Sequence, residues 1–238
     1  MTPVRSSGAF DLLICDCDGV IIDSEIVCDR ILMDMLREAY PGRDLAPALA
    51  GSFGLQTSDV LKRLEGHLEE DLPAGFYERL DQAIVETLLR EAAPIPGVRA
   101  ALEQIGLPVA VASNSSRDWI ELSVERAGLA ARIGGAIFSA ERVARPKPAP
   151  DVYLLAARES GVAPARCLVV EDSETGVAAA LAAGMSVIGF TGASHIPEHH
   201  PGRLLALGAL RIVESMDRLP AAVAAVDRAG LPEAATGG

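Results

Sequence analysis

The sequence predicts an α/β protein: a doubly wound, Rossmann-like parallel sheet with an inserted all-α helical cap domain. Short, nearly continuous apolar runs alternate with longer stretches of helical periodicity, and one long helical stretch interrupts this alternation near the N-terminus. Uninterrupted apolar runs are typical of parallel strands that are buried on both faces of a sheet. Their alternation with helices favours right-handed crossover connections.

The strands and helices can be placed in order along the chain. The apolar runs predict strands at 10–15, 108–112, 136–138, 167–170, 186–190 and 209–213. Helical patterns follow three of these runs, at 119–127, 151–159 and 174–183. Gly184 comes directly after the last of these helices, where glycine is favoured because the position after a helix C-terminus is often left-handed.

The interruption predicts a second domain. From about residue 23 to residue 91 the chain shows apolar stripes at helical spacing, such as Ile31 with Met35, and no strand pattern. Pro94 and Pro96 mark the return to the alternating pattern. A helical insertion of this length is long enough to form a small domain. We therefore expect a core domain of residues 1–22 and 93–238, and a helical cap domain of residues 23–92.

Composition narrows the possible partners and the location. The net charge of −12 argues against binding to nucleic acids or to anionic membranes, and no apolar run reaches the ~20 residues of a membrane span. Cys15, Cys17 and Cys167 lie in or beside apolar runs, where we expect them to pack rather than to bind metal, and Cys28 has no such context. A cytoplasmic location and a monomer are the resulting expectations.

Polar residues follow two of the predicted strands near the start of the core. Asp16 and Asp18 end the first run beside Gly19; such a pair can act as nucleophile and acid–base, or can be solvated acids at a strand end. Ser113 and Asn114 follow the second run. They can hold a phosphoryl oxygen, or can cap the next helix.

Two further segments carry charge. Lys147 lies between prolines, where its ammonium group can bind a phosphoryl group or can belong to an ordinary surface loop. Glu171 and Asp172 end the fourth run and open a helix; their oxygens suit Mg²⁺, although acidic residues are also favoured at a helix N-terminus. Ligands bind at the carboxyl ends of strands in open parallel sheets, so three of the four segments are expected to meet there.

The order of these four segments resembles the haloacid dehalogenase superfamily of phosphatases. Residues 16–20 with Asp23 and Ser24 resemble its first motif, and the other three motifs correspond to Ser113–Asn114, Lys147, and Glu171–Asp172 with Gly176. The helical insertion after the first motif is similar to the subfamily that holds β-phosphoglucomutase and phosphoglycolate phosphatase. The cap loop 49–53 resembles that of sugar-phosphate phosphatases, including those that act on 6-phosphogluconate.

The resemblance implies a reaction and a role for each motif residue. Asp16 would attack phosphorus and form an aspartyl-phosphate, and Asp18 would act as general acid and base. The phosphoryl group would be bound by Ser113, Asn114 and Lys147. Mg²⁺ would be held by Asp16, by the backbone carbonyl of Asp18, and by Glu171 and Asp172. The implied activity is a Mg²⁺-dependent phosphatase whose partner is a small-molecule phosphate ester, a sugar or sugar-acid phosphate.

Other activities within the superfamily are less well supported. A β-phosphoglucomutase-type mutase is the main alternative, but Cys28 stands where that pattern has a histidine. Dehalogenating members lack an aspartate at the position of Asp18, and a non-catalytic relative would have lost a motif residue. Outside the motifs, the histidines at 195, 199 and 200 are expected in a solvated loop rather than on a transition metal, and Trp119 is expected to pack.

Overall fold

The computed structural model describes residues 8–45, 49, 57–68 and 71–229. The chain divides into two compact units: Met1–Asp23 with Ala93–Gly238, and Ser24–Ala92. We call the first the core unit and the second the helical unit. Of the cap loop 49–53, residues 50–53 lie outside the described part of the chain.

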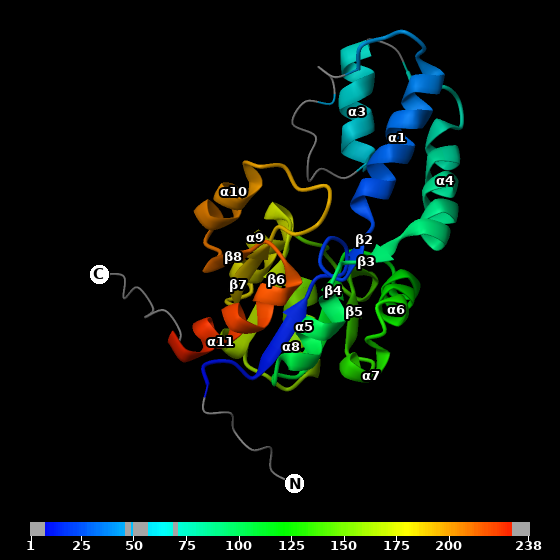
Figure 1. The fold of residues 1–238 in the computed structure, drawn as a ribbon. Coiled ribbons are helices and arrows are strands. Elements are labelled where there is room, and N and C mark those ends of the chain that lie inside the picture. Colours follow the sequence, from blue (N-terminus) through cyan, green and yellow to red (C-terminus); the bar gives the residue numbers. More distant parts are fainter. Residues whose placement is uncertain (1–7, 46–48, 50–56, 69–70, 230–238) are drawn as a thin grey trace. The chain divides into compact units, whose positions relative to one another are not determined.

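A parallel sheet forms the centre of the core unit. Within the described residues it has six strands in the order β5-β4-β1-β6-β7-β8, and every neighbouring pair is parallel (Figure 1). The strands are β1 Leu12–Cys15, β4 Val109–Ser113, β5 Ile137–Ser139, β6 Cys167–Glu171, β7 Ser186–Phe190 and β8 Arg211–Val213. The strand order changes direction beside β1, so this is the doubly wound fold that the alternation predicts, and the predicted fold class is confirmed.

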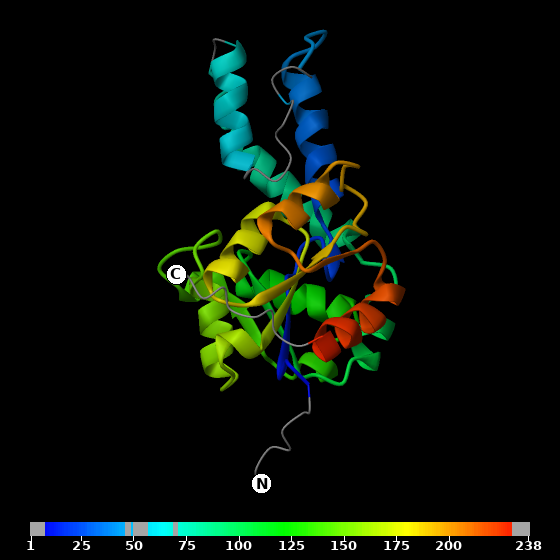
Figure 2. The ribbon, with the colours of Figure 1, turned by 90° about the vertical axis from the view of Figure 1, so that its left-hand side faces the viewer.

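Helices cover both faces of this sheet (Figure 2). α8 contacts β1, β4 and β5 and lies beside α9, whereas α5 lies beside α11. The longer helices are α5 Val98–Gln104, α6 Arg117–Arg126, α8 Asp151–Glu159, α9 Glu174–Ala182, α10 His200–Leu207 and α11 Leu219–Ala229. Shorter helical segments are α7 Ala130–Ile133, η1 Ala140–Arg142, η2 Pro164–Arg166 and η3 Met216–Arg218.

An additional pair of strands was not predicted. β2 (Ile22–Asp23) and β3 (Ala93–Pro94) pair antiparallel, with Ile22 opposite Pro94. The pair lies where the chain leaves the core unit and where it returns, so it joins the two ends of the helical insertion. Each strand has only two residues, which is too short for a period-2 pattern to be visible in the sequence.

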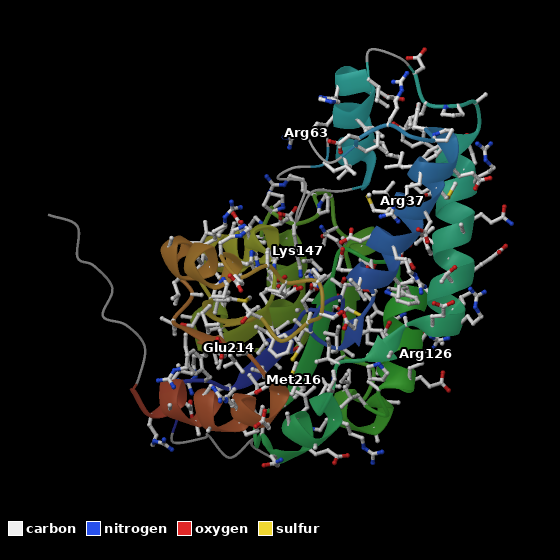
Figure 3. All side chains as sticks on the ribbon, turned by 45° about the horizontal axis from the view of Figure 1, so that its top comes forward. Arg37, Arg63, Arg126, Lys147, Glu214 and Met216 are labelled. Atoms are coloured by element: carbon white, nitrogen blue, oxygen red, sulfur yellow. The ribbon has the colours of Figure 1, made fainter. Side chains whose placement is uncertain are left out.

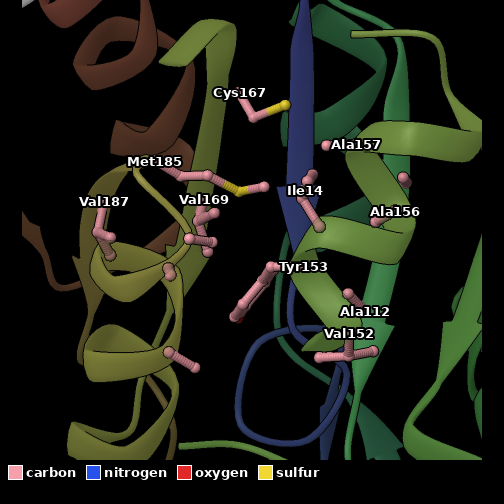
Figure 4. Close-up of a cluster of buried hydrophobic side chains, with 14 of the residues drawn as sticks. Ile14, Ala112, Val152, Tyr153, Ala156, Ala157, Cys167, Val169, Met185 and Val187 are labelled. Carbon is pink, nitrogen blue, oxygen red and sulfur yellow. The ribbon is translucent and has the colours of Figure 1, made fainter. Parts of the chain in front are cut away.

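The apolar core lies between the sheet and α8 and α9. Ile14, Val169 and Tyr153 belong to one buried cluster, with Ile14 and Tyr153 0% exposed (Figure 4). The strands that carry Ile14 and Val169, β1 and β6, are buried along their whole length, in agreement with their uninterrupted apolar sequence. α9 is rich in alanine, and its small side chains allow the helix to lie close to the sheet.

Three of the four cysteines are part of this interior, as predicted. Cys15, Cys17 and Cys167 are 0% exposed, whereas Cys28 in the helical unit is half-buried. Burial disfavours the thiolate and raises the pKa of Cys15 to about 12. These thiols therefore act as small apolar side chains.

The helical unit consists, in its described residues, of α1 Glu25–Ala39, α3 Thr57–Leu68 and α4 Phe76–Glu91. α1 packs against α4. Each of the three helices buries apolar side chains, among them Leu36 in α1, Leu64 in α3 and Leu80 in α4. Charged residues occupy the opposite faces, and Arg30 of α1 pairs with Glu91 at the end of α4. In the described ranges, no helix of either unit has the length and apolar character needed to span a bilayer.

Two adjacent leucines on α8 provide a test of the core. Leu155 is 4% exposed and belongs to the buried cluster, whereas Leu154 is 39% exposed. Leu155→Ala is expected to lower the free energy of unfolding by about 2–5 kcal/mol, because it removes buried methyl groups and leaves a cavity. Leu154→Ala is the matched control and should cost below about 1 kcal/mol, since surface substitutions have small effects. Urea denaturation measures both, and equal losses would contradict this placement of α8.

Candidate active site

The predicted functional segments meet at one end of three neighbouring strands. β1, β4 and β6 are adjacent and parallel, so their carboxyl ends lie at the same edge of the sheet. Asp16 follows β1 directly, Ser113 ends β4, and Glu171 ends β6. The backbone N–H of Asp16 donates to the carbonyl of Val170 (3.0 Å), which continues the ladder to the last residues of the strands.

The backbone of the turn after β1 lies close to Asp172, the second acidic residue of the fourth motif. Gly19 has a left-handed conformation with φ of +73°, and its N–H donates to the carbonyl of Ile22 (2.8 Å). A Cβ atom at Gly19 would lie 1.8 Å from Oδ2 of Asp172, so a side chain at this position would force Asp172 to move. Ile21 and Ile22 are 0% exposed and anchor the turn in the apolar interior. The glycine of this motif is thus required by both backbone conformation and space.

Lys147 lies at the centre of the site (labelled in Figure 3) and is 5% exposed. Its Nζ donates to Oδ1 of Asp16 (2.8 Å), to Oε1 of Glu171 (2.7 Å) and to the backbone carbonyl of Ala112 (2.9 Å). These bonds use all three N–H donors of the ammonium group. Burial alone would lower the pKa of Lys147, but the adjacent charges of Asp16 and Glu171 outweigh it and raise the pKa.

Asn114 holds the backbone of this lysine. Its Oδ1 accepts from the N–H of Lys147 (2.8 Å), and its Nδ2 donates to the carbonyl of Lys147 (3.2 Å). The side-chain amide therefore clamps the segment after β5 to the end of β4. The prediction that Asn114 binds a phosphoryl group stays a prediction, since both polar atoms of this side chain face Lys147 here.

Glu171 is 0% exposed, and each of its carboxylate oxygens accepts two hydrogen bonds. Oε1 accepts from Lys147 and from the hydroxyl of Tyr153 (2.8 Å), and Oε2 accepts from the N–H and the Oγ of Ser173 (both 3.0 Å). Burial favours the neutral acid, but the charge of Lys147 and these hydrogen bonds outweigh it and lower the pKa of Glu171.

Three carboxylates in the described residues lie close enough to share a cation. Oxygens of Asp16, Glu171 and Asp172 lie within 4.8 Å of one another, and all three residues are buried. Burial and the charges of Glu171 and Asp18 raise the pKa of Asp16 to about 7, against the opposing effect of Lys147. A set of oxygen donors with excess negative charge fits a hard divalent cation such as Mg²⁺.

The side chain of Asp18 is held by two residues of the segment that follows β4. Its Oδ1 accepts from the indole N–H of Trp119 (2.9 Å), and its Oδ2 accepts from the hydroxyl of Ser115 (2.6 Å). From the sequence, Trp119 was assigned to packing, and Ser115 was considered only as part of the segment after the second strand that could hold a phosphoryl oxygen or cap a helix; neither was expected to bind Asp18. Tyr153 was also missed, because its spacing in α8 fits an ordinary core position.

The expectation of a solvated histidine loop is wrong for two of the three histidines. His200 is 0% exposed, and its Nε2 contacts the backbone carbonyl of Asp172. The His195 side chain is 6% exposed, with Nε2 3.5 Å from Oδ2 of Asp172. The physical reason is that α10, which begins at His200, packs on α9 and β7, and the His200 ring contacts the residue that follows β6. His199 is exposed, as expected.

Comparison with known proteins shows the family to which the chain belongs. The model of the haloacid dehalogenase-like hydrolase family matches residues 10–184. Hexitol phosphatase A of Escherichia coli is 35% identical over 76% of this chain and 83% of its own. The chain therefore belongs to the haloacid dehalogenase-like hydrolases, and the resemblance inferred from the four motifs is confirmed.

Solved structures show the same fold. A haloacid dehalogenase-like protein of unknown function from Agrobacterium tumefaciens superposes with a TM-score of 0.83 at 37% identity, covering 91% of this chain and 98% of that one. A family hydrolase from Deinococcus radiodurans, with bound phosphate and sodium, has a TM-score of 0.78 at 33% identity, covering 92% of this chain and 96% of that one.

Two glycines in helices provide a test of the Glu171 environment. A Cβ atom at Gly176 in α9 would lie 1.6 Å from Oε1 of Glu171, whereas a Cβ atom at Gly202 in α10 would meet nothing within 4 Å. Gly202→Ala is expected to raise the free energy of unfolding by about 0.4–1 kcal/mol, because alanine restricts the unfolded chain. Gly176→Ala should lower it by about 1–3 kcal/mol, since a buried, hydrogen-bonded carboxylate must move. Chemical denaturation gives both signs, and stabilisation by Gly176→Ala would contradict the site as described.

Proposed function

We propose that the chain is a Mg²⁺-dependent phosphatase that hydrolyses a small sugar or sugar-acid phosphate through an aspartyl-phosphate on Asp16. The class of enzyme is already given by family membership and by phosphatase relatives: the chain is a hydrolase of phosphoric monoesters. The metal, the intermediate, the site residues and the substrate class are the proposal.

The observation that carries the proposal is the position of the Asp16 carboxylate. It lies at the end of the central strand β1, 8% exposed, with Oδ1 bound to the ammonium group of Lys147 at 2.8 Å. A nucleophile is most effective when its orientation is fixed before the reaction, and this ion pair fixes it. The nearby Asp18 supplies a second carboxyl group for proton transfer.

The reaction then has two balanced steps. A carboxylate oxygen of Asp16 bonds to phosphorus while the bond from phosphorus to the ester oxygen breaks, and Asp18 gives its proton to the departing alcohol. Asp18 next takes a proton from water as the oxygen of that water bonds to phosphorus. The bond from phosphorus to the Asp16 oxygen breaks in the same step, which releases phosphate and restores the Asp16 carboxylate. Phosphoryl transfer needs little covalent help beyond positioning and neutralisation of charge.

Two side chains support the proposal that the phosphoryl oxygens are bound here. Lys147 supplies a buried positive charge beside Asp16. Ser113 is 2% exposed, and its Oγ accepts from the N–H of Ser115 (3.1 Å), which leaves its own hydroxyl proton to be donated. We assign phosphoryl binding to both, with Asn114 acting on Lys147.

Mg²⁺ would be held by Asp16 and Asp172, by Glu171 directly or through a water, and by the backbone carbonyl of Asp18. When bound, it supplies positive charge to the phosphoryl oxygens. The fit rests on the donor set: in the described residues three carboxylates cluster, and Lys147 pairs with two of them, Asp16 and Glu171, which leaves excess negative charge for a divalent ion to balance.

The relatives support the substrate class. One is a hexitol phosphatase by name, and the Deinococcus protein binds phosphate in its crystals. The net charge of −12 does not favour a nucleic acid. We also propose that the helical unit, residues 24–92, works as the cap domain that selects the substrate. The monomeric state and the cytoplasmic location stay predictions.

Phosphate release from a panel of esters tests the activity. The panel holds hexose and hexitol phosphates, 6-phosphogluconate, phosphoglycolate and nucleotides, each with Mg²⁺ and with a chelator. We expect Mg²⁺-dependent release that is fastest for the sugar and sugar-acid phosphates. Release that is equal with chelator would contradict the metal. Conversion of β-glucose 1-phosphate to glucose 6-phosphate would replace the phosphatase by the mutase.

Replacement of the nucleophile tests the intermediate. Asp16→Asn should lower kcat roughly a thousandfold or more, because an amide oxygen is a poor nucleophile. Asp217→Asn, at an exposed position in η3, is the matched control and should keep wild-type kcat. Acid quenching of the wild type during turnover should give a phosphorylated peptide that contains Asp16. Normal turnover and unchanged Mg²⁺ dependence in Asp16→Asn would rule out the assigned role.

A further inference from the structure

The carboxylate of Asp18 is held by two donors from the segment that follows β4. The indole Nε1–H of Trp119 donates to Oδ1 at 2.9 Å, and the hydroxyl of Ser115 donates to Oδ2 at 2.6 Å. With one donor on each oxygen, the carboxylate group cannot turn about its last bond without losing a hydrogen bond. The two donors therefore restrain the orientation of this carboxyl group.

The two donors are themselves fixed by the core unit. Ser115 has its backbone carbonyl bound by the hydroxyl of Ser139 (2.7 Å), at the end of β5. Ser116 caps α6, and its Oγ accepts from the backbone N–H of Trp119 (3.4 Å). Glu141 accepts from the N–H of Arg117 (2.9 Å) and holds the first residue of the same helix. The orientation of Asp18 is therefore transmitted from β5 and from the start of α6.

The contact is specific to the polar edge of the indole ring. Trp119 is half-buried, and a position that needed only apolar packing would be served equally by phenylalanine or leucine. Here the ring is turned so that its single N–H reaches a carboxylate from a segment 101 residues earlier in the chain. The pairing thus joins the second motif segment to the acid–base residue of the first.

We propose that Trp119 and Ser115 are positioning residues that orient the Asp18 carboxyl group for proton transfer, an inference that rests on the proposed function. Neither residue contacts the reacting phosphorus; both act through Asp18. A misdirected acid fails to reach the ester oxygen at the moment when the bond from phosphorus to that oxygen breaks. The loss should therefore depend on how much the departing alcohol needs a proton.

Substrates with different leaving groups measure this dependence. The value of kcat/KM covers the steps up to departure of the alcohol, so later hydrolysis of the intermediate does not mask it. Trp119→Phe should lower kcat/KM for an alkyl ester such as hexitol phosphate roughly tenfold, a part of the 10²–10⁴-fold range typical of acid–base catalysis. For p-nitrophenyl phosphate, whose leaving group needs no proton, kcat/KM should stay within about twofold.

Matched variants separate orientation from folding. Ser115→Ala should show the same leaving-group dependence, and Ser115→Thr, which keeps the hydroxyl, should restore the alkyl ester rate. Glu121→Gln changes an exposed ion pair on the same helix and should leave both rates at wild-type values. Equal losses for both esters in Trp119→Phe would show a merely structural role and would overturn the proposal.

The contact can also be measured without any activity. The chain contains one tryptophan, so a spectrum of ¹⁵N-labelled protein shows one indole N–H signal. A carboxylate acceptor shifts that proton downfield, and Asp18→Ala should move it upfield, while Glu121→Gln leaves it in place. An indole N–H signal that keeps its wild-type chemical shift in Asp18→Ala would overturn the proposal.

The two assays also separate this proposal from the proposed function. Wild-type protein that releases no phosphate from either ester would overturn the proposed function and, with it, the catalytic meaning of the contact. Active wild-type protein with an unchanged ratio of rates in Trp119→Phe would overturn the positioning role alone.

Discussion

The ammonium group of Lys147 joins the ends of three neighbouring strands. Its bonds reach Asp16 after β1, the carbonyl of Ala112 in β4 and Glu171 at the end of β6. Without it, two carboxylates would lie buried beside each other with no opposite charge, and breaking a buried pair in this way typically costs about 3–5 kcal/mol. Other residues support the position of this ammonium group. Asn114 holds the backbone of Lys147, and the centre of the Tyr153 ring lies 4.6 Å from Nζ. The turn at Gly19 brings the backbone after β1 to the same end of the sheet.

The same arrangement explains how a strongly acidic chain can act on an anion. Global repulsion from a charge of −12 is screened over roughly 8 Å at physiological salt, so the local charges decide. Glu171 accepts four hydrogen bonds, one of them from Lys147, and it shares the cluster of buried carboxylates with Asp16 and Asp172. Three acidic groups and one buried ammonium group are thus brought together at the end of the central strands.

Much of this architecture could be predicted from the sequence because its signals are local. The strand that ends at Cys15 and the run Cys167–Glu171 are apolar without interruption, and their polar ends carry the motif residues. The contacts of Trp119 and His200 could not be predicted, since their partners lie 101 and 28 residues away and helical spacing alone is typical of packing. The β2–β3 pair was missed because two-residue strands have no period. Contacts of this kind depend on the tertiary fold, which brings the indole N–H of Trp119 to Asp18 and the His200 ring to the carbonyl of Asp172.

The burial of three thiols has a practical consequence for chemical labelling. Cys15 and Cys17 flank the proposed nucleophile, yet burial raises the pKa of both thiols, so neither forms a thiolate near neutral pH. Cys167 is equally enclosed at the start of β6. Cys28, half-buried on α1, is the remaining thiol of the chain and belongs to the other unit. A maleimide dye added to the native protein should therefore react mainly with Cys28 in α1. The helical unit can then be labelled with a fluorophore without an engineered cysteine.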